Sequence, residues 1–175
     1  MANHPTGRNG RSLKLYHELM TSKVTDILLV SCPYDAFIME EEGRLSTRII
    51  NEYKGLNLSK PPRITWVSSV PEAFDQLSRK PFDLILAMPS LEGTDVYSFA
   101  ARVKKRYPDL PFFMLLHNTC DVDHYVCRDD SGNIDQTYIW GGNADLLLAI
   151  IKNLEDCMNV ARDTDWAGVR VIIVV

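Results

Sequence analysis

The chain has 175 residues, of which 46% are hydrophobic and 24% charged, so it can bury the core of one ordinary domain but not of two. Its net charge of −4 offers no basic field to phosphate backbones, which excludes nucleic acid as an expected partner. Apolar runs such as 110–116 are far shorter than the roughly 20 residues that cross a bilayer, and residues 1–12 lack the apolar segment of a secretory signal. With only 4 cysteines, no disulfide scaffold is expected. We therefore expect a soluble cytoplasmic protein with no membrane partner.

Strands and helices are predicted to alternate along the chain. Short apolar runs without strict polar alternation predict strands that are buried on both faces. Apolar residues at helical spacing predict helices in segments between and after these strands. Pro71 suits the first turn of the helix that begins at Val70. The predicted strands are 26–31, 63–67, 82–88, 110–117, 134–140 and 169–175. The predicted helices are 13–21, 38–53, 70–77, 96–107 and 147–158.

This alternation predicts one doubly wound parallel sheet, because parallel neighbours need crossover connections and right-handed crossovers dominate. The expected fold class is α/β and flavodoxin-like, with strand order 2-1-3-4-5. The apolar run 169–175 is similar to 26–31, as though strand one were beginning again. We expect a tail and extra helix at 1–23, one domain at 24–160, and at 161–175 a linker with the first strand of a following module, so that the chain is a piece of a longer protein.

Three sequence segments resemble those of a known family: ILLVS, SSVPEAFDQLSRKPFDLIL and EGTDVYSFAARVKKRYPDLPFFML. From Thr25 to Asn159, about three quarters of the chain, the order of elements resembles the receiver domain of two-component response regulators. The resemblance implies an acidic pair after strand one that holds Mg²⁺, an Asp that ends strand three and accepts phosphate, a Ser or Thr ending strand four, and a Lys ending strand five. A phosphoryl group in transit needs this cation and ammonium because its negative charge is spread over several oxygens.

Every one of these functional positions differs in this sequence. The acidic pair falls on Ser31 and Cys32, the phosphate acceptor on Met88, the hydroxyl on Leu116, and the lysine on Trp140 or Gly141. A thioether, a leucine and an indole neither hold Mg²⁺ nor accept phosphate. The resemblance therefore implies a degenerate pseudo-receiver whose pocket is apolar and chemically silent, with no metal, cofactor or enzymatic activity of its own.

A narrower resemblance rests on SCPYDAFIMEEEGRL, YKGLNLSKPPRITWVSS, and YIWGGNADLLLAIIKNLED followed by GVRVIIVV. These segments resemble the N-terminal receiver-like region of bacterial phosphoenolpyruvate synthase and pyruvate phosphate dikinase-like proteins. In that family, similar modules precede a phosphotransferase region, which this sequence lacks. The resemblance implies a regulatory or protein-interaction module of a larger signalling or phosphotransferase protein. The expected partners are other domains of the same polypeptide, another protein or a second copy of the chain.

Two other functions compete with this interpretation. The first is a small-molecule sensor that uses the emptied apolar pocket. The second is a thiol-redox domain, because Cys32-Pro-Tyr-Asp resembles the redox motif of glutaredoxins, and a thiol at a helix start can have a lowered pKa. However, Asp35 stands where that motif has its second cysteine. We favour Cys32 as a small residue that fills a vacated acidic position.

The remaining polar candidates have simpler explanations. Asp35, Glu92 and Asp95 could form a substitute acidic site, but we expect acids in loops to be solvated. Residues of metal-ligand type, His117, Cys120, His124 and Cys127, have the spacing of one stripe of a helix after the fourth predicted strand. Along a continuous helix that stripe spans about 15 Å, so the four side chains cannot share one zinc ion.

Two aromatic residues, Tyr138 and Trp140, end the fifth predicted strand. Aromatic side chains are enriched at protein interfaces but are more common in cores. We expect core or domain contacts here, with an interface as the alternative.

Overall fold

The computed structural model describes residues 20–42, 45–55, 60–91, 93–125, 132–141 and 144–168. These residues form two compact units. The larger unit lies within Val24–Leu148, and the smaller consists of the described parts of Met1–Lys23 and Ala149–Val175. None of the helices in these ranges is long and apolar enough to span a membrane.

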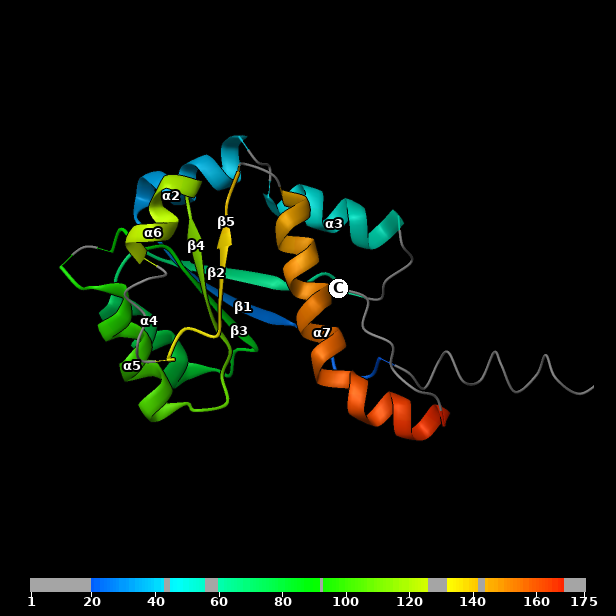
Figure 1. Ribbon diagram of the computed structural model, residues 1–175. Coiled ribbons are helices and arrows are strands. Elements are labelled where there is room, and N and C mark those ends of the chain that lie inside the picture. The colour runs from blue at the N-terminus through cyan, green and yellow to red at the C-terminus, as the bar shows by residue number, and fades with distance from the viewer. Residues whose placement is uncertain are drawn as a thin grey trace, which may run out of the picture. The chain divides into compact units, whose positions relative to one another are not determined.

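Five parallel strands form the sheet of the larger unit, in the order β2-β1-β3-β4-β5 (Figure 1). Ile27 of β1 lies opposite Ile64 of β2 and Leu84 of β3, which sets the register of the three strands. The predicted fold class and strand order are therefore confirmed. The strands are β1 (Asp26–Val30), β2 (Arg63–Val67), β3 (Leu84–Ala87), β4 (Phe112–Leu116) and β5 (Gln136–Ile139).

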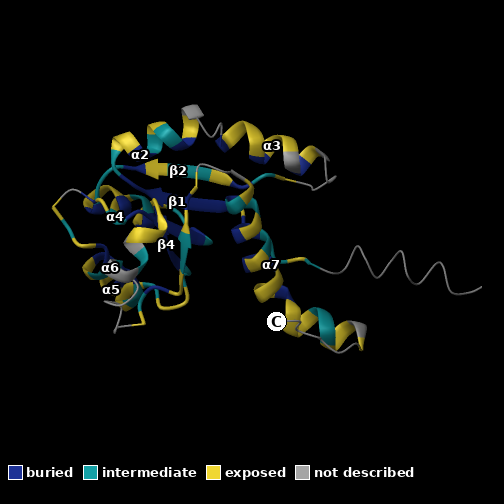
Figure 2. Cartoon of the chain, turned by 45° about the horizontal axis from the view of Figure 1, so that its top comes forward, coloured by how far each residue is buried: buried dark blue, intermediate teal, exposed yellow. Residues whose placement is uncertain are grey.

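The inner strands are buried along their whole length, as their unbroken apolar runs predict, and β1 is dark blue throughout in Figure 2. The edge strands differ from this prediction, since Arg63 and Trp66 of β2 and Ile139 of β5 are exposed. An edge strand has a neighbour on one side only, so less of its surface is covered.

Helical segments connect the strands, with two departures from the predictions among the described residues. Where one helix was expected over 38–53, a π-helical turn at Ile38–Glu42 is followed by a helix at Leu45–Gly55, and a short helix at Pro33–Phe37 precedes them. The last helix continues to Ala167, where a linker was expected from 161. The predicted helix 13–21 and strand 169–175 lie outside the described residues, except for Met20 and Thr21, which are not helical. The helical elements are α2 (Pro33–Phe37), η1 (Ile38–Glu42), α3 (Leu45–Gly55), α4 (Val70–Arg79), α5 (Val96–Arg106), η2 (Thr119–Asp121), α6 (Val122–Tyr125) and α7 (Ala144–Ala167).

Side-chain caps start the two helices α4 and α5. The Ser69 hydroxyl accepts a hydrogen bond from the Glu72 amide (3.4 Å), and Pro71 lies in the first turn, as predicted. The Asp95 carboxylate accepts from the Ser98 amide (3.2 Å). Each cap satisfies an amide that has no partner inside its helix, so local sequence determines where both helices begin.

Helices α4 and α5 cover one face of the sheet through a common hydrophobic core. The Phe99 ring of α5 meets the rings of Phe74 and Phe112 edge to face, at 5.8 and 5.3 Å between centroids. Alternate residues of the inner strands complete this core, because successive side chains of a strand point to opposite faces. The members from the inner strands are Leu28, Val30, Ile85, Ala87, Phe112, Met114 and Leu116.

The opposite face carries η1 and α3. A cavity of about 410 Å³ there is lined by Leu29 of β1 together with Met39 and Leu45, both of which are buried. The larger unit therefore has helices on both faces of its sheet, as a doubly wound fold requires.

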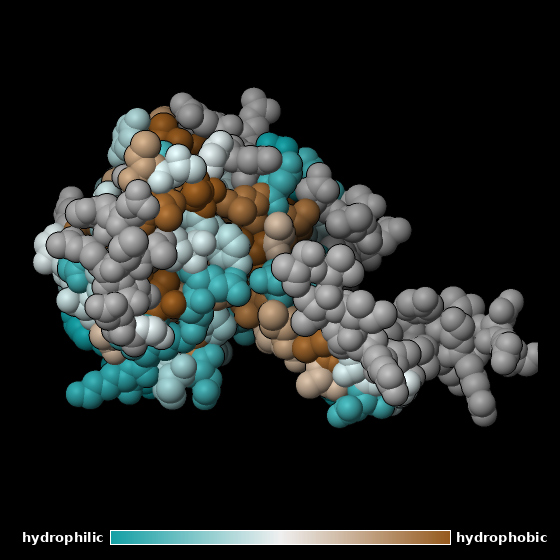
Figure 3. All heavy atoms as spheres, in the orientation of Figure 1, coloured by the Kyte–Doolittle hydropathy of each residue, from teal (hydrophilic) through white to brown (hydrophobic). Residues whose placement is uncertain are grey.

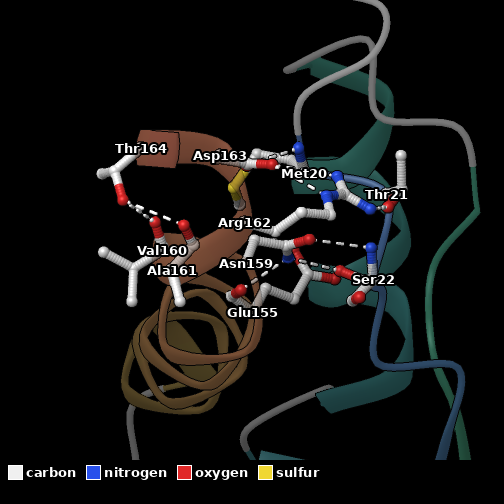
Figure 4. A network of polar contacts seen from close by, with 10 residues as sticks. All are labelled: Met20, Thr21, Ser22, Glu155, Asn159, Val160, Ala161, Arg162, Asp163 and Thr164. Atoms are coloured by element: carbon white, nitrogen blue, oxygen red, sulfur yellow. Dashed lines mark hydrogen bonds and ion pairs between the residues drawn. The ribbon is translucent and has the colours of Figure 1, made fainter. Parts of the chain in front are cut away.

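The smaller unit joins the segment Met20–Lys23 to α7 through polar contacts (Figure 4). Ser22 and Asn159 exchange two hydrogen bonds of 2.9 and 2.8 Å, and the Asn159 side chain is buried. The Met20 amide donates to Asp163 (2.8 Å), and this bond holds the pKa of Asp163 below its ordinary value. Paired side-chain and backbone groups thus hold together two segments that are far apart in sequence.

Candidate functional site

The carboxyl ends of the strands lie at one edge of the sheet, and the positions singled out in the sequence follow them there. The Met88 amide, just after β3, donates to Val30 (2.9 Å). The Trp140 amide, just after β5, donates to Leu116 at the end of β4 (2.6 Å). Strand order reverses between β1 and β3, and ligands of doubly wound sheets bind outside the strand ends at such a point.

A cavity of about 280 Å³ opens at this edge, and we call it the strand-end cavity. Of the six residues predicted to form the degenerate pocket, Met88 and Trp140 line it. The Ser31 hydroxyl instead accepts a hydrogen bond from the Trp66 indole (3.1 Å), and Leu116 belongs to the hydrophobic core. Cys32 is half-buried and Gly141 is exposed. The cavity is lined by Tyr34, Asp35, Ile38, Met39, Met88, His117 and Trp140.

The Asp35 carboxylate overturns the expectation that the nearby acids are solvated. Asp35 is only 4% exposed, because only two residues separate α2 from the buried strand β1, which places Asp35 beside the strand ends. One carboxylate oxygen, Oδ1, lies 3.2 Å from Nε2 of His117. The other, Oδ2, has no hydrogen-bond partner among the described residues. The strand-end cavity is therefore not chemically silent.

The contact between Asp35 and His117 was not predicted from the sequence. Both positions were noticed separately, Asp35 as a loop acid and His117 as the start of a helical stripe. Each follows a buried strand closely, Asp35 after β1 and His117 directly after β4. Their positions just after buried strands could have predicted that the two residues lie close together, because the carboxyl ends of parallel strands share one edge of the sheet.

Trp140 is an interior residue rather than an interface residue. It is 4% exposed, and its indole Nε1 has no hydrogen-bond partner within the described part of the chain. Tyr138 is half-buried, with its ring 5.7 Å from that of Phe113 and its hydroxyl bonded to Gln136. Only Tyr138 of this pair therefore offers surface to a partner.

The environment of Cys32 opposes thiolate chemistry. Burial raises the pKa of the Cys32 thiol, and the Asp35 carboxylate adds to that effect, which outweighs the backbone hydrogen bonds that favour the thiolate. A reactive cysteine needs the opposite shift, since the thiolate is the nucleophile. Cys32 therefore has the character of a structural cysteine.

Among the described residues, the remaining candidates form no alternative acidic or metal site. The stripe from His117 is not one continuous helix but a 3₁₀ turn followed by the short α6. Cys127 and Glu92, and the side chain of His124, lie outside the described residues, whereas Asp95 caps α5. Across the described residues, no three His, Cys, Asp or Glu side chains are grouped to hold a metal ion.

No protein-family model matches the sequence. No curated protein matches it either. Solved structures of receiver domains do share the fold. The signal receiver domain of an HD domain-containing protein from Pseudomonas fluorescens Pf-5 is 17% identical, with a TM-score of 0.60 over 82% of this chain and 95% of that one.

Two further receivers are similar to the same degree. A response regulator from Thermotoga maritima, solved in complex with Mg²⁺ and BeF, is 18% identical with a TM-score of 0.57 over 74% of this chain and 98% of that one. The receiver domain of a sensor histidine kinase from Pseudomonas aeruginosa PAO1, with magnesium in its active site cleft, is 19% identical with a TM-score of 0.54 over 77% of this chain and 98% of that one. The chain therefore has the flavodoxin-like fold of response-regulator receiver domains.

Proposed function

We propose that this chain is a receiver-like regulatory module that does not accept phosphate. The observation that carries the proposal is Met88, which is fully buried directly after β3, at the position where the receiver resemblance places the phosphate-accepting Asp. A thioether has no oxygen nucleophile for a phosphoryl group. Phosphorylation at this position would therefore require a residue that the chain does not have there.

The described residues around Met88 also lack the pair of carboxylates and the lysine that phosphoryl transfer in receivers uses. Mg²⁺ takes oxygen ligands in near-octahedral geometry and is usually held through one or two carboxylates together with substrate phosphates. Asp35 is the one carboxylate that lines the strand-end cavity as the structure describes it, and it already contacts His117. Trp140 takes the position of the expected lysine, so no ammonium would balance the phosphoryl charge.

Without phosphotransfer, we infer that the module acts by binding other domains of its polypeptide, another protein or a second copy. Large hydrophobic side chains reach the surface at the carboxyl edge of the sheet, where Tyr34 is 70% and Phe37 is 58% exposed. Figure 3 shows hydrophobic residues at the surface near the end of β5. Such residues supply contact area to protein interfaces. On its own the module is then not an enzyme.

Beryllofluoride binding tests the loss of phosphorylation. We expect no saturable change in tryptophan fluorescence when beryllofluoride is added with millimolar Mg²⁺, and no Mg²⁺-dependent labelling by acetyl phosphate. The Thermotoga maritima response regulator, which was solved with Mg²⁺ and BeF, is the positive control. Saturable Mg²⁺-dependent binding to this chain would refute the proposal.

We further propose that the parent is a phosphoenolpyruvate synthase-like phosphotransferase, on the narrower resemblance alone. The test is the gene sequence downstream of the codon for Val175. It should continue into a further receiver-like segment and then a phosphotransferase region. A stop codon directly after Val175 would contradict this parent.

A further inference from the structure

Two buried polar groups in the lining of the strand-end cavity have no hydrogen-bond partner among the described residues. Asp35 Oδ2 is an acceptor without a donor, and Trp140 Nε1 is a donor without an acceptor. Both residues are only 4% exposed, so bulk water does not compensate either group. Leaving such groups unpaired is unfavourable, and most buried polar groups in native structures have a hydrogen-bond partner from the protein or from ordered water.

The rest of the lining restricts what the occupant can be. Met39 and Met88 are buried in the wall of the cavity, where their thioether and methylene groups would contact the apolar part of a ligand. The Asp35 carboxylate repels anions, which excludes a phosphate-like ligand. A metal ion would find the Asp35 carboxylate and the His117 imidazole, but no third His, Cys, Asp or Glu grouped with them among the described residues, and the Trp140 N–H cannot coordinate it.

We propose that the strand-end cavity binds a small neutral organic molecule that carries an amide or hydroxyl group on an apolar body. The polar group donates to Asp35 Oδ2 and accepts from Trp140 Nε1, while the body contacts Met39 and Met88. This inference rests on the proposed function, since the ligand occupies the edge at which receivers are phosphorylated. A cavity of about 150 Å³ can hold benzene, so the 280 Å³ here accommodates roughly ten non-hydrogen atoms.

Entry to the cavity is available from the surface. Tyr34 is 70% exposed and the His117 side chain is 42% exposed, whereas the other lining residues are more deeply placed. Water offers the same donor and acceptor as the proposed ligand, so the experiment has to separate an organic occupant from solvent.

Nuclear magnetic resonance of the ¹⁵N-labelled full chain provides that separation. The three tryptophans give three indole N–H signals, and Trp140→Phe identifies the one from Trp140. The probes are benzamide and pentanamide, which carry donor and acceptor, against benzoate and benzylamine, which have the shape of benzamide but carry a single charge. We expect at least one amide to shift the Trp140 signal saturably, with benzoate and benzylamine binding at least about tenfold more weakly.

A pair of matched variants tests the contact with Asp35. Asp35→Leu removes the acceptor and should weaken amide binding at least about tenfold. Asp109→Leu, at an exposed loop position, should leave it unchanged. If Asp35→Leu does not fold, the probe series on the wild-type chain still decides the question.

Four results would overturn the ligand class. If neither amide moves the Trp140 signal, the cavity holds only water. If benzoate binds more tightly than the amides, the site prefers anions. If benzylamine binds more tightly than the amides, the site prefers cations. An Asp35→Leu variant that binds the amide like wild type removes Asp35 from the site. None of these results bears on phosphorylation, which the beryllofluoride measurement tests separately.

Discussion

Asp26, at the amino edge of the sheet, has a cationic partner for each carboxylate oxygen, whereas Asp35, at the carboxyl edge, has one oxygen without a described partner. The Asp26 oxygens lie 2.8 Å from Arg63 and 2.7 Å from Lys80. Burial opposes ionisation of Asp26, but these two hydrogen bonds outweigh it and hold the pKa of Asp26 below its ordinary value. Both carboxylate oxygens of Asp26 at the amino edge are therefore paired with a cation.

Asp83 completes the amino edge by binding the start of β1. One of its carboxylate oxygens accepts from the Thr25 amide (2.7 Å), the Thr25 hydroxyl (2.8 Å) and the Asp26 amide (3.0 Å). Paired charges and satisfied amides stabilise the fold, while unpaired buried groups beside a cavity are available to a ligand. The amino edge thus has its charges paired, whereas the carboxyl edge has unpaired buried groups at which we propose ligand binding.

A second carboxylate at the carboxyl edge should have the largest effect. Met88→Asp places a charge at a fully buried position that shares a cavity with Asp35, and no Lys or Arg is among the described residues that line this cavity. We expect the free energy of unfolding to fall by about 3 kcal/mol or more, measured by urea denaturation. Met88→Leu keeps the volume and should lose less than about 1.5 kcal/mol. Equal stabilities for the two variants would mean that this position is solvated.

Removal of the Asp83 carboxylate tests the amino edge. Asp83→Ala deletes three hydrogen bonds and leaves the Asp26 amide without its acceptor, so a loss of about 2 kcal/mol is expected. The matched control is Asp109→Ala at an exposed loop position, which should stay within about 0.5 kcal/mol of wild type. If the two variants lose the same amount, Asp83 has no special role.

The ion pairs of Asp26 predict a pH-dependent difference. Asp26→Asn should lower the free energy of unfolding by about 1–2 kcal/mol at neutral pH. Because the folded pKa of Asp26 is lowered, its contribution is complete above the unfolded value of about 3.9 and disappears as the pH falls through the folded value. Urea denaturation of both proteins at neutral pH and near the acid limit of folding measures the difference. A difference that stays constant across this range would contradict the ion-pair assignment.

Neutralising Asp35 should have the smallest effect on stability. Asp35→Asn keeps an oxygen for His117 and removes a charge that is only partly compensated, so we expect a change within about 0.5 kcal/mol. Thermal and urea denaturation beside Asp26→Asn test the comparison directly. It fails if the loss at Asp35 equals or exceeds the loss at Asp26.

Much of the fold was accessible from local sequence. The apolar runs identified all five strands of the sheet, and the predicted strand order is the observed one. Pro71 in the first turn of α4 and the α5 stripe from Val96 were also predicted, whereas the Ser69 cap was not. These features depend on a few neighbouring residues, because periodicity and capping are local properties. The π-helical turn at Ile38–Glu42 was not predicted, since the apolar residues on either side of it keep helical spacing.

The sequence by itself determined the doubly wound sheet and put Met88, rather than a carboxylate, at the end of β3. Only the tertiary structure decided that Asp35 is buried, that it meets His117, and that the Trp140 indole lies inside the same cavity lining. These residues follow three different strands, and side chains so far apart in sequence meet only once the crossovers bring the strand ends to one edge. Burial and hydrogen-bond satisfaction are properties of that assembled edge, which no single segment specifies.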